Sequence, residues 1–120
     1  MRRAMKLIIG LVVAGSLVFG GPVAADTFRV KTTDNNRWNP DFRHITRGDR
    51  IKWINPARFD TVHNVKSYRR NWDFFETLSP GERTSKRFRR EGEFRYRCTL
   101  HSELNDGVCT GMCGMIHVMN

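Results

Sequence analysis

Short runs of alternating apolar and polar side chains constrain the fold of this chain more than any other feature. Residues 27–32 and 50–55 both alternate in this way, as a strand with one buried face should. The other strand candidates are residues 62–68, 83–88, 93–98 and 114–118, and turn-forming clusters lie at 34–36, 47–49 and 79–82. The sequence has no amphipathic helix of ordinary length, so it predicts an all-β domain.

Short strands with regular turns between them predict an antiparallel sandwich or barrel. Residues 83–88 and 93–98 are expected to pair as a hairpin through the turn at 89–92. Residues 71–78 fit either an irregular loop or a helical turn, with three aromatic side chains directed inward: Trp72, Phe74 and Phe75. The tryptophans and most phenylalanines are expected to form the core, because aromatic side chains bury the largest area per residue.

Residues 1–25 have the layout of a secretory signal peptide. Basic residues precede an apolar run over residues 7–19, and small residues follow at 23–25. The run is shorter than the ~20 residues that span a bilayer, which favours cleavage after Ala25 over an uncleaved membrane anchor. The expected mature domain is residues 26–120, periplasmic or secreted and without stable membrane insertion.

The chain is strongly basic, with 21 lysines and arginines, 12 acidic residues and a formal net charge of +9. Residues 1–25 hold three of the basic residues and none of the acidic ones, so the expected mature domain carries +6. Such a charge favours partners with acidic surfaces and steers their approach. Nucleic acid is a weaker interpretation, because the basic residues are scattered through strand candidates and no nucleic-acid-binding motif occurs.

The cysteines indicate a metal site. There are three of them, Cys98, Cys109 and Cys113, and an odd number leaves at least one thiol for another role. Cys98 and His101 lie three residues apart where a strand candidate ends, so both side chains can point at one centre. Met112 can add a thioether and His63 a second imidazole. Two imidazoles, a thiolate and a weak axial thioether are the ligands of a blue-copper electron-transfer site.

The ordered set of motifs resembles the plastocyanin and pseudoazurin branch of the cupredoxins. The matching segments are residues 47–53 (RGDRIKW), 63–65 (HNV), 79–82 (SPGE) followed by Phe88, and 111–116 (GMCGMI). The resemblance spans most of residues 27–118 and implies a Greek-key β-sandwich of the cupredoxin type. It also implies one mononuclear copper ion at one end of the sandwich, bound by His63, Cys98, His101 and Met112. Asn64 would then hold the two ligand-bearing loops together through hydrogen bonds.

The chain departs from that family in the segment between His101 and Met112, which is expected to be a polar loop longer than in the close family pattern. The added length leaves Met115 as an alternative axial ligand, although strand pairing should have begun there. Cys109 and Cys113 are four residues apart, and in an oxidising compartment they form either a disulfide or two free thiols.

The sequence therefore predicts an exported type 1 copper protein that carries single electrons to redox partner proteins, as a monomer and not as an enzyme. Three other functions stay open: a copper-ion carrier, a metal-free interaction domain, and a structural zinc domain. The zinc site would use Cys98, Cys109, Cys113 and His101. His101 is expected to be the more exposed imidazole, beside either an apolar docking rim or plain loop packing made by Leu100, Leu104 and Val108. His44 and His117 are interpreted as ordinary surface or strand residues.

Overall fold

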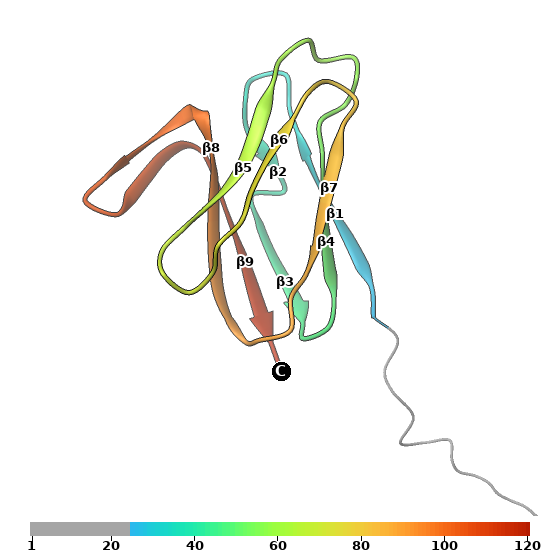
Figure 1. The fold of residues 1–120 in the computed structure, drawn as a ribbon, viewed down its shortest axis with the longest axis vertical. Helices are drawn as coiled ribbons and strands as arrows, with labels where there is room; N and C mark the ends of the chain where they lie inside the picture. Colours follow the sequence, from blue (N-terminus) through green and yellow to red (C-terminus); the bar gives the residue numbers. More distant parts are fainter. Residues whose placement is uncertain (1–24) are drawn as a thin grey trace, which may run out of the picture.

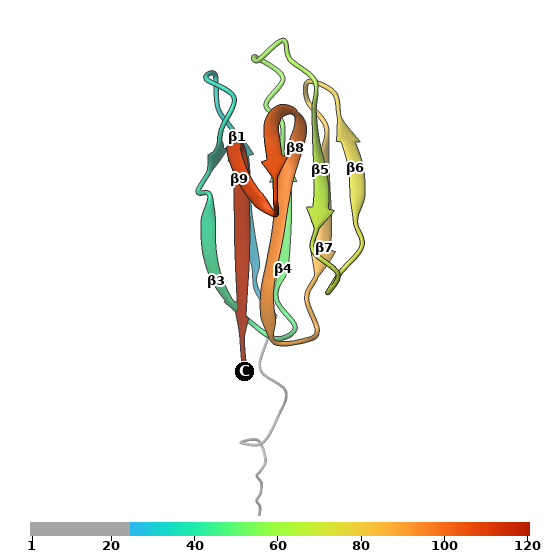
Figure 2. The same ribbon diagram turned by 90° about the vertical axis from the view of Figure 1, so that its left-hand side faces the viewer.

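The computed structural model describes residues 25–120, and residues 1–24, which hold almost all of the predicted signal peptide, lie outside it. One sheet has the strand order β2-β1-β4-β7: β1 (Thr27–Thr32), β2 (Trp38–Asn39), β4 (Arg50–Ile54) and β7 (Arg83–Arg87). The other has the order β3-β9-β8-β5-β6: β3 (Phe42–Thr46), β5 (His63–Tyr68), β6 (Phe75–Leu78), β8 (Gly92–Asn105) and β9 (Val108–Met119). The two sheets face each other as the layers of a sandwich (Figures 1 and 2).

The predicted all-β sandwich is confirmed, but its sheets are mixed and not purely antiparallel. β1 runs parallel to β4, and β3 runs parallel to β9, whereas the other neighbouring strands are antiparallel. Alternation of side chains shows which face of a strand is buried and carries no information about the direction of its neighbour. No helix within residues 25–120 is long and apolar enough to cross a bilayer.

The aromatic side chains form the predicted core between the sheets. Trp53 on β4 is fully buried, and its ring lies 5.3 Å from Tyr96, 5.5 Å from Phe74 and 6.4 Å from Phe88. These offset and edge-on contacts join the two sheets directly, because Trp53 belongs to one sheet and Tyr96 on β8 to the other. The core therefore fixes how β8, which carries Cys98, lies over the opposite sheet.

The predicted hairpin of residues 83–88 and 93–98 is wrong. β7 pairs with β4, whereas β8 pairs with β5 and β9, so residues 88–91 carry the chain from one sheet to the other. Phe88 and Phe94 are both buried, with their rings 5.2 Å apart. Because the two strands lie in opposite sheets, the two rings enter the core from facing sides. In a flat hairpin within one sheet, both rings would approach the core from the same side.

Residues 71–74 are irregular, in line with the loop alternative, whereas Phe75–Leu78 forms β6 and pairs with β5. Trp72 is buried and Phe74 is partly buried against the core, as expected. Phe75 is 53% exposed, so its predicted inward position is wrong. Its ring instead lies 5.6 Å from the Lys66 ammonium on the neighbouring strand, a cation–π contact on the sheet surface.

Candidate metal centre

Three ligand atoms from two strands converge at one end of the sandwich. The Cys98 sulfur lies 3.7 Å from Nδ1 of His63 and 3.5 Å from Nδ1 of His101. Cys98 and His63 are fully buried, whereas His101 is half-buried. The structure thus brings together three of the four metal ligands that the sequence predicted. Within residues 25–120, no other group of three or more His, Cys, Asp or Glu side chains has all its ligand atoms within 4.8 Å of one another.

A break in strand pairing creates this convergence. β8 and β9 pair regularly up to Arg97 opposite Cys113 and resume at Ser102 opposite Gly111. Residues 98–101 of β8 therefore face only Met112 of β9, so four residues of one strand lie opposite one residue of the other. The Ser102 hydroxyl donates to the Cys98 carbonyl and closes this bulge. A bulge redirects side chains that a regular strand would send to alternate faces, and here it places Cys98 and His101 side by side.

Asn64 connects the two segments that carry these side chains. Its Nδ2 donates to the Thr99 hydroxyl at 2.8 Å, and the Thr99 backbone N–H donates to Asn64 Oδ1 at 2.9 Å. The Asn64 backbone N–H also donates to the Cys98 sulfur at 3.4 Å. The buried Asn64 side chain thereby holds the start of β5 against the bulge in β8, where the resemblance placed it.

Met112 and Met115 lie on opposite faces of β9. Met112 is fully buried, and it shares the inward face with Gly114, Ile116 and Val118. Its carbonyl also accepts a hydrogen bond from the buried Trp38 indole at 3.2 Å. Met115 pairs with Phe42 on the outward face of the five-stranded sheet, away from the buried Cys98. Of the two methionines, only Met112 faces the interior that Cys98 occupies.

The segment after His101 is a β-hairpin and not the expected polar loop. Residues 102–111, called the arm below, pair from Ser102 opposite Gly111 to Asn105 opposite Val108, and project from the sheet (Figure 1). The tip residues Asp106 and Gly107 have φ values of 51° and 80°, as a two-residue turn of type I′ requires. The Asp-Gly pair was the available sequence signal for this hairpin, and sequence reasoning missed it.

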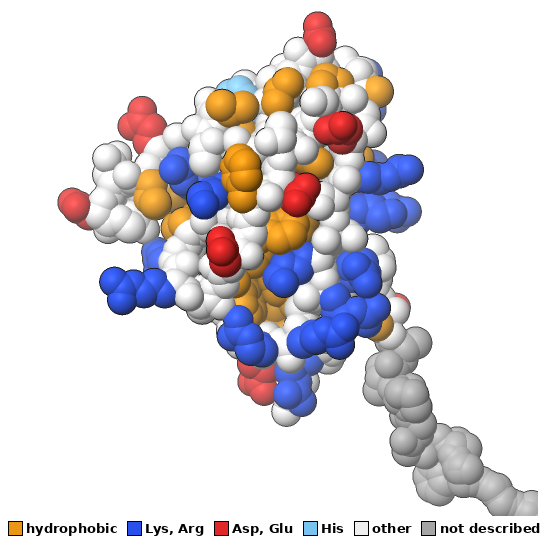
Figure 3. Space-filling view, in the orientation of Figure 1, with side chains coloured by type: hydrophobic (Ala, Val, Ile, Leu, Met, Phe, Trp, Pro, Cys, Tyr) orange, Lys and Arg blue, Asp and Glu red, His pale blue; other side chains and the backbone are white. Residues whose placement is uncertain are grey.

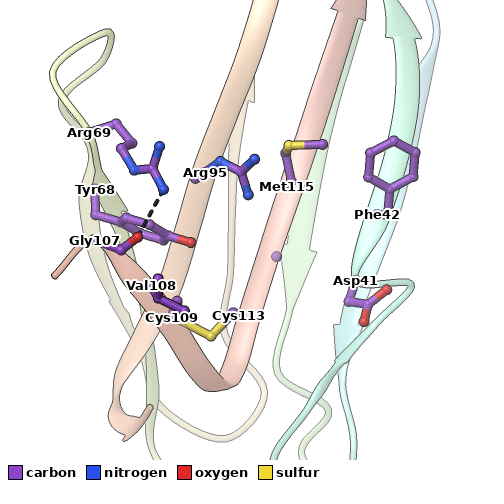
Figure 4. A pocket seen from close by; sticks show the side chains of 11 residues that line it. Asp41, Phe42, Tyr68, Arg69, Arg95, Gly107, Val108, Cys109, Cys113 and Met115 are labelled. Carbon is purple, nitrogen blue, oxygen red and sulfur yellow. Dashed lines mark hydrogen bonds between the residues drawn. A yellow bond between two sulfur atoms is a disulfide. The ribbon is translucent and has the colours of Figure 1, made fainter. Parts of the chain in front are cut away.

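A disulfide joins Cys109 and Cys113, which decides between the two states that the sequence left open. It links the arm to the regular part of β9 and encloses Met112 between its two cysteines. Arg69 donates to the Gly107 carbonyl at 2.9 Å and ties the arm tip to the sheet (Figure 4). A cavity of about 460 Å³ lies between the arm and the outer sheet face, lined by the disulfide, Tyr68, Arg95 and Met115 among others. The disulfide and Arg69 together restrain both ends of the arm.

The geometry of the three ligand atoms fits a single transition-metal ion. Metal–sulfur and metal–nitrogen bonds of about 2.3 and 2.0–2.1 Å, at trigonal to tetrahedral angles, separate sulfur from nitrogen by about 3.5–3.8 Å. The observed separations of 3.5 and 3.7 Å match. A zinc site that includes Cys109 and Cys113 does not fit, because their sulfurs are bonded to each other and offer no thiolate. The donors that remain are two imidazoles, one thiolate and a nearby thioether, which suit copper.

The His63 imidazole strongly prefers its neutral form. Burial, with a smaller contribution from the neighbouring His101, lowers the pKa of His63 from 6.5 to about 4. Its Nε2 atom is buried and has no hydrogen-bond partner among the described residues, so nothing there stabilises a positive charge. A neutral imidazole is also the form that binds metal ions.

We therefore expect the metal-free protein to lose stability as the pH falls from about 6.5 to about 4. In this window the unfolded chain binds a proton at His63 and the folded chain does not, so acid favours unfolding. The effect on the free energy of unfolding is at most roughly 3 kcal/mol. Urea titrations across this pH range would measure it. His63→Gln should flatten the pH dependence, and equal slopes in wild type and His63→Gln would contradict the prediction.

Comparison with known structures places this fold among the cupredoxins. A mutant of amicyanin in its reduced state has a TM-score of 0.60 and 20% sequence identity, over 78% of this chain and 82% of that chain. A purple cupredoxin from Nitrosopumilus maritimus has a TM-score of 0.57 and 20% identity, over 76% of this chain and 98% of that chain. The copper-containing nitrite reductase NirK from Thermus scotoductus SA-01 has a TM-score of 0.62 and 23% identity, over 83% of this chain but only 23% of the enzyme.

These structures show that the chain has the cupredoxin fold, as the sequence motifs indicated. At these identities the likeness extends to the fold and not to a particular protein. No family model matches the chain, and no curated protein matches it. The function must therefore be argued from the chain's own site.

Proposed function

We propose that this chain is a type 1 copper protein that carries single electrons between partner proteins, and that it is exported after removal of residues 1–25. The observation that carries the proposal is the cluster of one buried thiol and two imidazole nitrogens, separated from the sulfur by 3.5 and 3.7 Å. In the proposal His63, Cys98 and His101 would hold the ion, and Met112 would supply the fourth, weaker ligand. The buried, inward-facing position of Met112 supports this choice over Met115.

Bound copper would supply the exchange of one electron between Cu(I) and Cu(II). The residues around the site are suited to holding the same ligand positions in both states. Asn64 fixes the start of β5 to the bulge, and the Trp38 indole fixes the backbone at Met112. The Asn64 backbone N–H donates to the Cys98 sulfur and would stabilise its negative charge. Burial of Cys98 and His63 excludes water, so little rearrangement would accompany electron transfer.

His101 is the more exposed of the two imidazoles and is the proposed route for the electron. Leu100 next to it is 58% exposed, and Leu104 and Val108 on the arm are 38% and 63% exposed. These apolar side chains would form the contact surface for a partner. Lysines and arginines gather over the lower and middle parts of the face in Figure 3, and few lie at the upper end, where β5 begins (Figure 1). That distribution, with the net charge, would orient partners with acidic surfaces.

A copper-ion carrier is the second candidate function. It would need to release its ion readily to a partner, and the exposed edge at His101 would be the point of access. Full burial of Cys98 and His63, and the hydrogen bonds that hold both segments, favour retention of the ion instead. The two functions therefore predict opposite rates of copper release.

The proposal is tested by loading the protein with one equivalent of Cu²⁺. We expect intense visible absorption from charge transfer between thiolate and copper, bleached by ascorbate and restored by reoxidation. Loss of the ion within seconds to a copper chelator would support the ion carrier instead. Zn²⁺-loaded protein is the colourless control. Failure to develop the absorption at full copper occupancy would overturn the blue-copper assignment.

A further inference from the structure

The outward face of the five-stranded sheet carries two histidines in contact that the proposed copper centre does not use. His44 on β3 and His117 on β9 are directly paired across parallel strands, which lie side by side in Figure 2. Their Nδ1 atoms are 3.0 Å apart, and their ring centroids are 4.9 Å apart with planes inclined at 58°. His44 is exposed and His117 half-exposed, so both are open to ions in solution.

From this geometry we propose that His44 and His117 form a second metal site, for a divalent transition-metal ion with Cu²⁺ bound most tightly. Metal–nitrogen bonds of about 2.0–2.1 Å with an angle near 90–100° at the ion place two nitrogens about 3.0 Å apart. The imidazole nitrogens already stand at that separation. In the metal-free pair one Nδ1 donates to the other. A bound ion takes the place of that proton, which moves through solvent to Nε2 of the same ring, so the strands need not move. Imidazole ligands favour copper and zinc, and divalent copper binds most strongly in the first-row series.

Glu93 supplies a third ligand from the other side of His117. It is the residue directly opposite His117 on β8, so His44, His117 and Glu93 form one row across three neighbouring strands. Side chains directly opposite on antiparallel strands have Cβ atoms about 4.5–5.5 Å apart, within reach of a flexible carboxylate. Glu93 now pairs at 3.4 Å with Arg95, and both side chains are substantially exposed. Exposed pairs of this kind contribute little, so turning the carboxylate toward an ion costs little.

This site is separate from the proposed copper centre. Cys98 lies five residues beyond Glu93 along β8, or about 17 Å, and on the inward face of the sheet. Occupation of the second site therefore leaves the thiolate untouched, and the Cu²⁺ bound there should give little visible colour. The site also exists whether or not the blue-copper assignment is correct, because none of its residues contributes to that centre.

Zn²⁺ and Cu²⁺ binding to the full chain tests the proposal. Besides binding at the centre formed by His63, Cys98 and His101, titration calorimetry should show one further event that disappears in the double variant His44→Gln/His117→Gln. Each single variant should weaken this further event about tenfold or more. The loss should occur equally in a Cys98→Ser background, which separates it from the copper centre. In protein labelled with ¹⁵N, Zn²⁺ should shift the imidazole signals of His44 and His117, and a second equivalent of Cu²⁺ should give a paramagnetic signal without intense absorption.

Glu93→Gln should weaken binding less than either histidine substitution, and Glu91→Gln is its matched control in the adjoining turn. Equal affinity in Glu93→Gln and Glu91→Gln would overturn the carboxylate ligand. Equal stoichiometry and affinity in wild type and the double histidine variant would overturn the site and leave the pair as a plain hydrogen bond. Far-UV circular dichroism of each variant shows whether the fold is retained.

Discussion

Copper-loaded Cys98→Ser protein is expected to be nearly colourless and to bind copper far more weakly than wild type. The Cys98 sulfur is the atom that both imidazole nitrogens approach, and it accepts the hydrogen bond from the Asn64 backbone N–H. A serine hydroxyl is a hard donor that stays protonated near neutral pH, so it replaces neither the covalent copper–sulfur bond nor the charge-transfer band. Visible absorption and copper titration of both proteins would measure the loss.

The other two cysteines provide the matched control for this variant. Replacing Cys109 and Cys113 together by serine opens the disulfide but leaves the three ligand atoms in place. This double variant should keep the intense absorption band. Loosening of the arm around Met112 should at most shift the energy of that band. If Cys98→Ser kept the band, or if the double variant lost it completely, Cys98 would not be the thiolate ligand.

Gly114→Ala is expected to destabilise the fold strongly, through a clash in the core and not through backbone strain. Gly114 lies directly opposite Tyr96 across β8 and β9. An added methyl group would fall 2.7 Å from Cε2 of the Tyr96 ring, and closer still to Cζ and Oη. The ring cannot retreat, because it is fully buried with Trp38 at 5.4 Å and Trp53 at 5.3 Å. Overpacking of such a site costs about 3 kcal/mol and lowers the melting temperature by more than about 10 °C.

Thermal and urea unfolding would measure this effect, with Gly48→Ala as the control. Gly48 has a φ of 97° and no atom within 4 Å of an added Cβ, so its substitution reports backbone strain without a clash. A Gly114→Ala/Tyr96→Leu double variant should be less unstable than the two single effects combined, since the smaller side chain relieves the contact. Additive effects, or a Gly114→Ala loss no larger than that of Gly48→Ala, would show that the clash with Tyr96 is not the cause.

Short-range patterns were sufficient to predict most of the strands. Residues 27–32 became β1, and 50–55 and 62–68 correspond closely to β4 and β5, because alternation directly reports a half-buried strand. The same patterns could not show that β7 and β8 lie in different sheets, because pairing depends on distant partners. The arm was also missed, since its polar composition suggested a loop although Asp106-Gly107 carried a turn signal.

The residue types of the candidate centre could be chosen from the sequence, because a soft thiol, two imidazoles and a thioether form an unusual set in an ordered pattern. The convergence of these side chains on one point could not be predicted from the sequence. It depends on the bulge that leaves residues 98–101 opposite Met112 alone, and on the hydrogen bonds between Asn64 and Thr99 across 35 positions of sequence. The choice between Met112 and Met115 likewise needed the register of β9, which decides the face on which each side chain lies.

The pair of His44 and His117 shows the same division most clearly. Each residue alone reads as a solvent-exposed strand position, and that interpretation of its orientation is correct. Their nitrogens meet at 3.0 Å only because β3 and β9, 73 positions apart at these residues, lie parallel and in register. Composition and local alternation determined that this chain forms a small β-domain with copper-binding residue types, because those properties act within a few residues. Strand order, direction and register decided which of those residues meet, because they follow from packing two sheets around one core.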